Sequence, residues 1–309
     1  MSQPMDLGFA VPISGSWATP ERQVEVAQSA ERLGYRSLWT FQRLLYPATG
    51  EPWAPVYAAV HDPIVTLGFL AGLTSRVRLG LAVVNLPFFA PVVLAKALTT
   101  LDVVSGGRLV AGLGLGWSKE EFAATGAEYA GRGARAEEYL ALLDKIWRDD
   151  VVSHDGPLYP LPPTRVDPKP VQRPRPRVVL GGGAPAALER AGRLADGWVA
   201  GSVSNLESTA AAVTAVRAAA TAAGRDPDTL DYVVRGAVRL RPGGASDRRL
   251  LSGSLAEIEG DLTRLAQAGV TETFLDLNFD EEVGRPDADA DASMDRARTL
   301  LDHFAPARG

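Results

Sequence analysis

The sequence contains no cysteine among its 309 residues. This absence excludes a disulfide framework, a cysteine-based zinc site and a thiol nucleophile, and no other residue pattern indicates a metal centre. The net charge of −5 argues against nucleic acid or an anionic membrane as the main partner. The sequence also lacks a run of 18 apolar residues, and its first residues lack a basic stretch followed by an apolar one. We therefore expect a cytoplasmic protein without a transmembrane segment.

Histidine is scarce, and only one of the three histidines is a candidate for proton transfer. His154 lies in a Gly/Pro-rich loop, and His303 lies in the last expected helix. His61 precedes Asp62-Pro63, behind a long segment that follows the second expected strand. Its side chain titrates near neutral pH, so a catalytic role is one interpretation and a structural role is the other.

The glycine-rich stretch RLVAGLGLGWSKEEF (108–122) resembles the beginning of a nucleotide fold but lacks its fingerprint. Glycines occur at alternating positions 112, 114 and 116, and no glycine falls three residues after Gly114. The acidic residue expected about 20 positions further on, at the end of a second strand, is also missing in that context. Two explanations remain open: a ligand approaches the backbone closely, or the strands pack tightly here.

Apolar β-rich runs alternate with helical patterns along the whole chain. Helix starts carry Thr19-Pro20, Asp62-Pro63, Pro91 and Pro185. Eight such units predict an α/β fold, a (β/α)8 TIM barrel in one domain over 1–309, with loop insertions at its C-terminal face. The expected strands are 7–13, 36–41, 77–85, 108–116, 176–183, 196–201, 231–240 and 270–279.

Two further features point to the carboxyl ends of these strands. Segment 42–61 is too long for a plain connector and follows the second strand, where active sites of such barrels lie. Gly181, Gly182 and Gly183 end the fifth strand immediately before a helix that begins with Pro185. Backbone N–H groups and a positive helix end favour an anion such as phosphate there, although a flexible turn is the alternative.

Three stretches carry a resemblance to a known family: LGYRSLWTFQRLLYP (33–47), residues 74–126, and VVLGGGAPAALERAGRLADGWV (178–199). They resemble the bacterial luciferase-like monooxygenase superfamily, whose members use FMN or the deazaflavin F420. The pattern GxGxGW followed by an acidic helix start is most similar to the F420-using branch. The resemblance implies a flavin-type cofactor, a small-molecule substrate and pairing of two copies through the helices 63–73 and 91–104.

The resemblance also implies which residues surround the cofactor. A bulge with a non-prolyl cis peptide bond is expected within 81–84, behind the ring. The glycines 181–183 would hold the phosphate. The full set of implied cofactor contacts is Gln42, Ala82, Val83, Val84, Leu115, Gly116, Trp117, Gly181, Gly182, Gly183, Ala200 and Gly201.

The chain departs from the family pattern after LW at the end of the second strand. Many relatives carry Asp-His or a similar pair there, whereas this chain has Gln42 and Arg43. We expect both side chains to face the active site. Arg43 stays charged and would stabilise negative charge rather than deliver a proton. The alternative is that Arg43 is a solvated loop charge. Because Arg43 would not deliver a proton, His61 is a candidate for proton transfer.

Aromatic residues near loop and strand ends suggest a wide apolar substrate pocket, lined by Trp17, Tyr46, Trp53 and Trp117. The resulting interpretation is an F420-dependent oxidoreductase that transfers hydride to or from a small organic substrate. One alternative is an FMN-dependent monooxygenase whose reduced flavin comes from a separate reductase. Another is a barrel that binds a flavin or metabolite without turnover.

Overall fold

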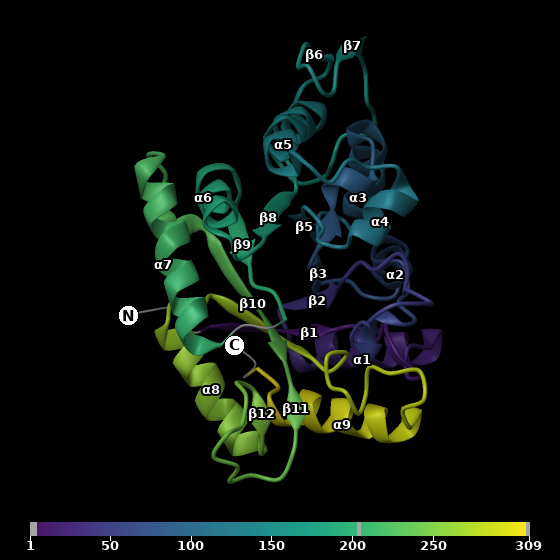
Figure 1. Cartoon of the computed structure of the whole chain (residues 1–309), viewed down its shortest axis with the longest axis vertical. Helices are drawn as coiled ribbons and strands as arrows, with labels where there is room; N and C mark the ends of the chain where they lie inside the picture. Colours follow the sequence, from purple (N-terminus) through teal and green to yellow (C-terminus); the bar gives the residue numbers. More distant parts are fainter. Residues whose placement is uncertain (1–4, 203–204, 307–309) are drawn as a thin grey trace.

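A computed structural model describes residues 5–202 and 205–306 of the chain and shows a closed parallel β-barrel surrounded by helices (Figure 1). The eight barrel strands are β1 (Asp6–Ala10), β2 (Ser37–Thr40), β3 (Arg78–Leu81), β5 (Leu109–Gly114), β8 (Arg177–Gly181), β9 (Gly197–Val199), β10 (Asp231–Ala237) and β13 (Glu272–Asp276). Seven of them fall within the ranges expected from the sequence, β1 begins one residue before its expected range, and the (β/α)8 prediction is confirmed.

Parallel pairing closes the barrel without a free edge. The first strand, β1, pairs with the last, β13, with Phe9 opposite Leu275. On the other side, β3 pairs with β5, with Leu79 opposite Leu109. The two-residue strand β4 (Val84–Asn85) continues β3 after a bulge and also pairs with β5. All eight barrel strands are parallel, so their carboxyl ends meet at one face of the barrel.

Local capping residues begin the helices where the sequence indicates. Thr19 accepts a hydrogen bond from the Arg22 N–H at the start of α1 (Pro20–Leu33). Asp62 accepts one from the Val65 N–H at the start of α2 (Pro63–Ala71). The other helices are α3 (Pro91–Val104), α4 (Lys119–Thr125), α5 (Arg132–Arg148), α6 (Pro185–Leu194), α7 (Leu206–Ala222), α8 (Leu255–Gln267) and α9 (Ala290–His303).

Large side chains fill the barrel interior below the carboxyl face. Trp39 stacks on Phe274 with 5.0 Å between ring centroids. Gly80 makes room for that ring, because a Cβ there would lie 2.4 Å from the indole of Trp39. The Trp39 Nε1 donates to Glu272 at 2.7 Å, and burial raises the pKa of the Glu272 carboxyl. This packing closes the amino-terminal half of the barrel, so the interior is a core rather than a pore.

Connecting segments differ at the two ends of the barrel. Segment 41–62, after β2, lies at the carboxyl face, and so does α4, a short helix that the sequence analysis did not identify. Segment 149–176 instead leads from α5 to the start of β8 and contains the hairpin of β6 (Val152–His154) and β7 (Leu161–Thr164). Figure 1 shows this hairpin beyond α5, at one extremity of the molecule.

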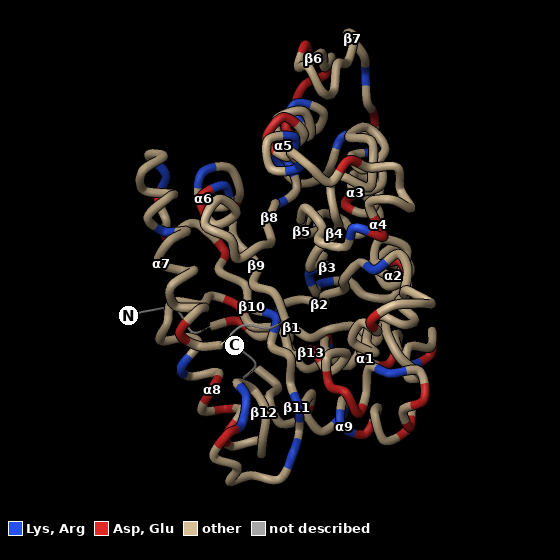
Figure 2. The backbone as a smooth tube through the Cα atoms, in the orientation of Figure 1, with Lys and Arg blue, Asp and Glu red and all other residues tan. Residues whose placement is uncertain are grey.

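Charged side chains lie mainly on the outer helices and loops, whereas the barrel strands carry few of them (Figure 2). In the part of the chain that the structure describes, every helix is too short or too polar to cross a membrane.

Candidate active site

A cavity of about 390 Å³ opens at the carboxyl ends of the barrel strands. This volume lies within the usual range for small-molecule sites. Its wall consists of residues in or just after seven of the eight barrel strands, all except β1, and of residues in the adjoining loops. The lining residues are Phe41, Gln42, Arg43, Tyr57, Ala82, Val83, Asn85, Gly114, Leu115, Gly116, Trp117, Arg132, Gly181, Gly182, Gly183, Ala184, Ala187, Val199, Ala200, Gly201, Ser202, Arg235 and Phe279.

The bulge between β3 and β4 forms one side of this cavity. The Ala82–Val83 peptide bond is cis, as expected for residues 81–84. Two glycines of the GxGxG stretch make room for the bulge. A Cβ at Gly112 would lie 1.5 Å from the Leu81 carbonyl oxygen, and one at Gly114 would lie 2.4 Å from a Val83 methyl group. Packing against this bulge therefore explains Gly112 and Gly114.

The opposite end of the cavity reaches the amino terminus of α6. Ala184 precedes this helix and provides no side-chain cap, so the first turn presents backbone groups. A Cβ at Gly183 would meet no atom within 4 Å, which shows that the space in front of the helix is open. Arg132, at the start of α5, lines the same cavity. These features can hold an anion by backbone N–H groups, the helix dipole and a guanidinium.

Gln42 is held in a fixed orientation beside the bulge. Its side-chain Oε1 accepts a hydrogen bond from the Asn85 backbone N–H at 2.9 Å, and its own N–H donates to the Val83 carbonyl at 3.3 Å. The residue is only 3% exposed. Its Nε2 finds no partner among the described residues. A buried amide donor is therefore available to a molecule in the cavity.

Arg43 lines the cavity as expected, but its charge is balanced. Its Nη1 donates to Glu121 Oε2 at 3.0 Å, and the Glu121 side chain is fully buried. The guanidinium also lies 4.7 Å from the ring centroids of Tyr57 and Trp117. Burial lowers the pKa of Arg43, whereas the Glu121 carboxylate opposes this effect, and the guanidinium stays charged near neutral pH. Arg43 therefore offers N–H donors rather than an uncompensated positive charge.

Arg235 is a site residue that the sequence analysis missed. It projects from β10 into the cavity, where its Nη1 donates to Asp276 Oδ2 at 2.8 Å and its Nη2 donates to the Ala82 carbonyl. The side chain of Asp276 is completely buried. A lone charged residue inside the apolar strand DYVVRGA was the available signal, because such a residue must find a partner inside the fold.

The structure does not bring all expected site residues to the cavity. His61 is exposed and its Nδ1 lies 3.0 Å from Gln23 Nε2 of α1, outside the barrel rim. Trp17 and Val84 are fully buried in the hydrophobic core. Tyr46 and Trp53 do not line the cavity: the Tyr46 hydroxyl donates to the Trp53 carbonyl, and the Trp53 ring packs against Trp117 with 5.0 Å between ring centroids. We do not retain these five residues in the site.

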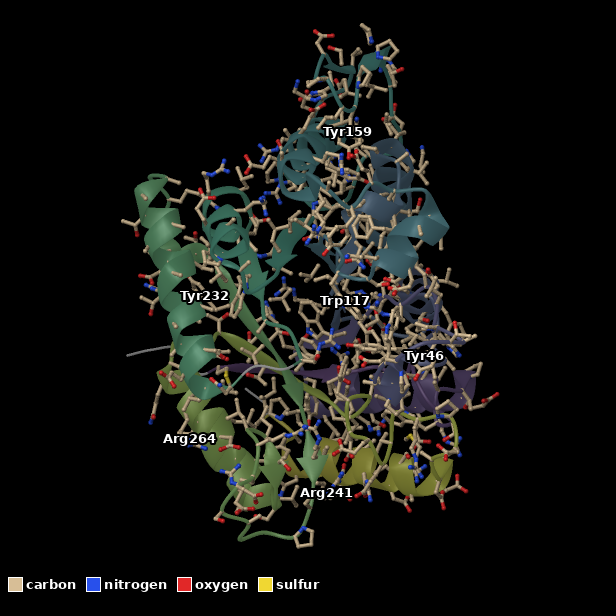
Figure 3. The ribbon with its side chains drawn as sticks, viewed as in Figure 1. Tyr46, Trp117, Tyr159, Tyr232, Arg241 and Arg264 are labelled. Carbon is tan, nitrogen blue, oxygen red and sulfur yellow. The ribbon has the colours of Figure 1, made fainter. Side chains whose placement is uncertain are left out.

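The remaining expected residues line one cavity: Gln42, Arg43, Ala82, Val83, Leu115, Gly116, Trp117, Gly181, Gly182, Gly183, Ala200 and Gly201. Figure 3 shows Trp117 near the centre of the molecule and Tyr46 farther toward one side. Their convergence supports the assignment of the site, and the role of each residue stays a prediction.

A parallel (β/α)8 barrel with a lined cavity at its carboxyl face is the architecture of many barrel enzymes. This chain belongs to the luciferase-like monooxygenase family, whose model matches residues 5–298. It is accordingly related to oxidoreductases that use flavin-type cofactors.

Two curated relatives illustrate the similarity. An uncharacterized protein of Mycobacterium tuberculosis is 31% identical over 205 residues, which cover 63% of this chain and 72% of the relative. The FMNH(2)-dependent dimethylsulfone monooxygenase of Pseudomonas putida is 31% identical over 241 residues, covering 72% of this chain and 63% of the relative.

Solved structures show the same fold at lower identity. The monooxygenase RslO1 of Streptomyces bottropensis superposes with a TM-score of 0.79 at 22% identity, covering 98% of this chain and 99% of the other. An F420-dependent secondary alcohol dehydrogenase, solved with an F420–acetone adduct, superposes with a TM-score of 0.78 at 16% identity, covering 99% and 100%.

Proposed function

We propose that this chain is an oxidoreductase that binds coenzyme F420 and transfers hydride to or from a small organic substrate. The observation that carries the choice of F420 is a second cavity, of about 700 Å³, lined largely by residues of α6 and α7. Both cavities are lined by Gly182, Gly183 and Gly201. The expected phosphate position therefore opens into the second cavity. F420 continues beyond its phosphate as a long tail, whereas FMN ends there.

The residues present fit such a cofactor. The glycines 181–183 and the uncapped start of α6 suit a phosphate, and Arg132 adds a cation to the same cavity. Ala82 and Val83 of the bulge line the cavity without a large side chain, which leaves room for a flat ring system.

In this proposal the bound deazaflavin supplies the hydride chemistry, and the protein supplies position and electrostatics. The bulge orients the ring, and the α6 terminus anchors the phosphate. Among the described lining residues, no carboxylate, lysine or histidine is present, but Tyr57 carries a hydroxyl group. A proton that the reaction requires would therefore come from water, from the substrate or from the Tyr57 hydroxyl rather than from Arg43.

FMN is the second candidate, and one observation favours it. The dimethylsulfone monooxygenase that resembles this chain at 31% identity is FMNH(2)-dependent. In that case a separate reductase would supply the reduced flavin, and the reaction with oxygen would insert one oxygen atom into the substrate.

Parallel titration distinguishes the two candidates. We expect F420 to bind at least tenfold more tightly than FMN, because the space behind the phosphate position accepts its tail. The measurement is the change in cofactor fluorescence on addition of the purified protein, with reduced FMN tested anaerobically by calorimetry. Tighter binding of either form of FMN would favour the second candidate. If F420, oxidised FMN and reduced FMN all fail to bind, both candidate functions are contradicted.

We also propose a homodimer, formed through α2 and α3. These helices expose apolar side chains to solvent, with Val65 72% and Val93 60% exposed. Phe69, Val103 and Val104 extend this surface. Contiguous exposed apolar residues of this kind mark association sites.

Replacing Phe69 with glutamate is therefore expected to give a monomer, because it places a charge within the apolar interface. Multi-angle light scattering at micromolar concentration gives the mass of each variant. Leu194→Glu is a suitable control, because Leu194 is also exposed but lies at the end of α6, on the other side of the barrel from α2 and α3 (Figure 1). A monomeric wild-type protein would contradict the proposal.

A further inference from the structure

Four aromatic side chains from three separate segments form one wall of the cavity. Phe41 and Tyr57 lie in segment 41–62, Trp117 follows β5 and Phe279 follows β13. The Phe41 and Phe279 ring centroids are 5.2 Å apart, those of Tyr57 and Phe279 are 5.9 Å apart, and those of Tyr57 and Trp117 are 6.2 Å apart. These pairs of ring planes are inclined at 52°, 80° and 53°, so the wall offers both ring faces and ring edges, and both favour contact with an aromatic molecule.

Two guanidinium groups lie against this wall. Arg235 lies 4.7 Å from the Phe279 ring centroid and 5.1 Å from that of Phe41. Arg43 stacks on Tyr57 and Trp117. Each is paired with a buried carboxylate that does not line the cavity, so neither requires a full negative charge on a ligand. We call the space lined by Phe41, Gln42, Arg43, Tyr57, Trp117, Arg235 and Phe279 the aromatic chamber.

Two donors in the aromatic chamber are buried without a partner among the described residues: Gln42 Nε2 and Arg43 Nε. The Asn85 N–H occupies the oxygen of the Gln42 amide, and this bond leaves the nitrogen as the free end. A buried donor without a partner is destabilising. A ligand with an oxygen acceptor at this point supplies the partner, whereas a hydrocarbon does not.

We propose that the aromatic chamber binds a planar, conjugated carbonyl compound, such as a quinone or an aryl ketone, as the substrate. The rings of the wall contact the flat conjugated system with their faces and edges, and the Gln42 amide and the arginines recognise the carbonyl oxygens. A cationic substrate would find no carboxylate, because none lines the described part of the cavity. This inference rests on the proposed function, since the chamber is the part of the same cavity away from the phosphate position.

Three probes separate the contributions of ring and carbonyl. They are 1,4-naphthoquinone, naphthalene, which lacks the carbonyls, and cyclohexane-1,4-dione, which lacks the aromatic ring. Ligand-observed NMR with the full chain gives each dissociation constant. Since the protein has no cysteine, the quinone meets no thiol that it could alkylate. We expect naphthoquinone to bind at least tenfold more tightly than either comparison probe, and equal affinities would overturn the proposal.

Variants assign the recognition to particular side chains. Gln42→Glu keeps an oxygen for the Asn85 N–H but replaces the amide donor with an acceptor. It should weaken naphthoquinone binding about tenfold and leave naphthalene unaffected. Phe279→Leu should weaken the binding of both naphthoquinone and naphthalene.

Tyr159→Leu is the control, because Tyr159 packs on Tyr139 beside the β6–β7 hairpin, far from Trp117 (Figure 3). Unchanged naphthoquinone affinity in both chamber variants would overturn the assignment.

The same titration is repeated in protein saturated with the oxidised cofactor that it is found to bind. Naphthoquinone affinity should persist, because the chamber and the cofactor position are separate parts of the cavity. Loss of binding would show that the probe occupies the cofactor position and would overturn the proposal. The binding of naphthoquinone to cofactor-free protein needs no redox step. It can therefore succeed where the cofactor titration fails, or fail where that titration succeeds.

Discussion

A Gly183→Asp variant is expected to fold normally and to bind the phosphate-bearing cofactor about 100-fold more weakly than the wild-type protein. Gly183 is the best position for this test, because a side chain can be added there without a steric clash. An added side chain there enters open space, whereas Gly182 has a φ of +131° and its Cβ would lie 2.8 Å from that of Ala187. A carboxylate in front of α6 repels the phosphate, and charge-assisted hydrogen bonds of about 1.5–3 kcal/mol are lost.

Gly183→Asn is the matched control, because it has nearly the same shape without the charge. It should lose less than tenfold in affinity. Fluorescence titration gives both dissociation constants, and thermal unfolding checks that the two variants fold equally well. Equal affinities of the aspartate and asparagine variants would show that the phosphate does not bind at the α6 terminus.

Most of the fold was accessible from the sequence because its determinants are local. The alternation of apolar runs with capped helices fixes the order of strands and helices, and the caps at Thr19 and Asp62 are visible as residue types. The glycines 181–183 were also recognisable, since they join a strand end to Pro185. Family resemblance, rather than local pattern, placed the bulge near Ala82 and Val83.

The missed features depend on contacts between segments that are distant in sequence. Glu121 balances Arg43 across 78 positions, and Asp276 balances Arg235 across 41. Neither pairing is encoded in a short motif, so the sequence suggested an uncompensated positive charge at Arg43. The structure corrects this expectation by placing Glu121, on α4, directly against the guanidinium.

The misplaced residues share a related cause. Trp17 and His61 were assigned to the mouth because they follow strand ends or a long loop, but sequence position does not give the direction of a side chain. In this protein, backbone contacts determine the direction of the Trp17 and His61 side chains. The Ser14–Val60 bridge and the bond from the His61 N–H to the Ile13 carbonyl hold these two segments together. Trp17 then packs inward, and His61 faces outward beside α1.

An Asp276→Asn variant is expected to lose about 3–5 kcal/mol in the free energy of unfolding, because it leaves Arg235 buried without a counterion. The asparagine oxygen can still accept the bonds from Asn278, but its NH2 group would face the guanidinium donor. Urea denaturation measures the change. A loss below about 1 kcal/mol would contradict the structural role of the pair.

A double variant, Arg235→Met with Asp276→Asn, removes the buried charges and keeps an oxygen for the bonds from Asn278. The Asp276→Asn change alone leaves a buried, unpaired guanidinium, and the second substitution removes it, so at least half of the lost stability should return. Stability and binding should then diverge. The double variant keeps its fold but lacks the Arg235 guanidinium beside Phe279 and Phe41, and its affinity for 1,4-naphthoquinone should stay reduced. Recovery of both properties would show that Arg235 serves only to balance Asp276.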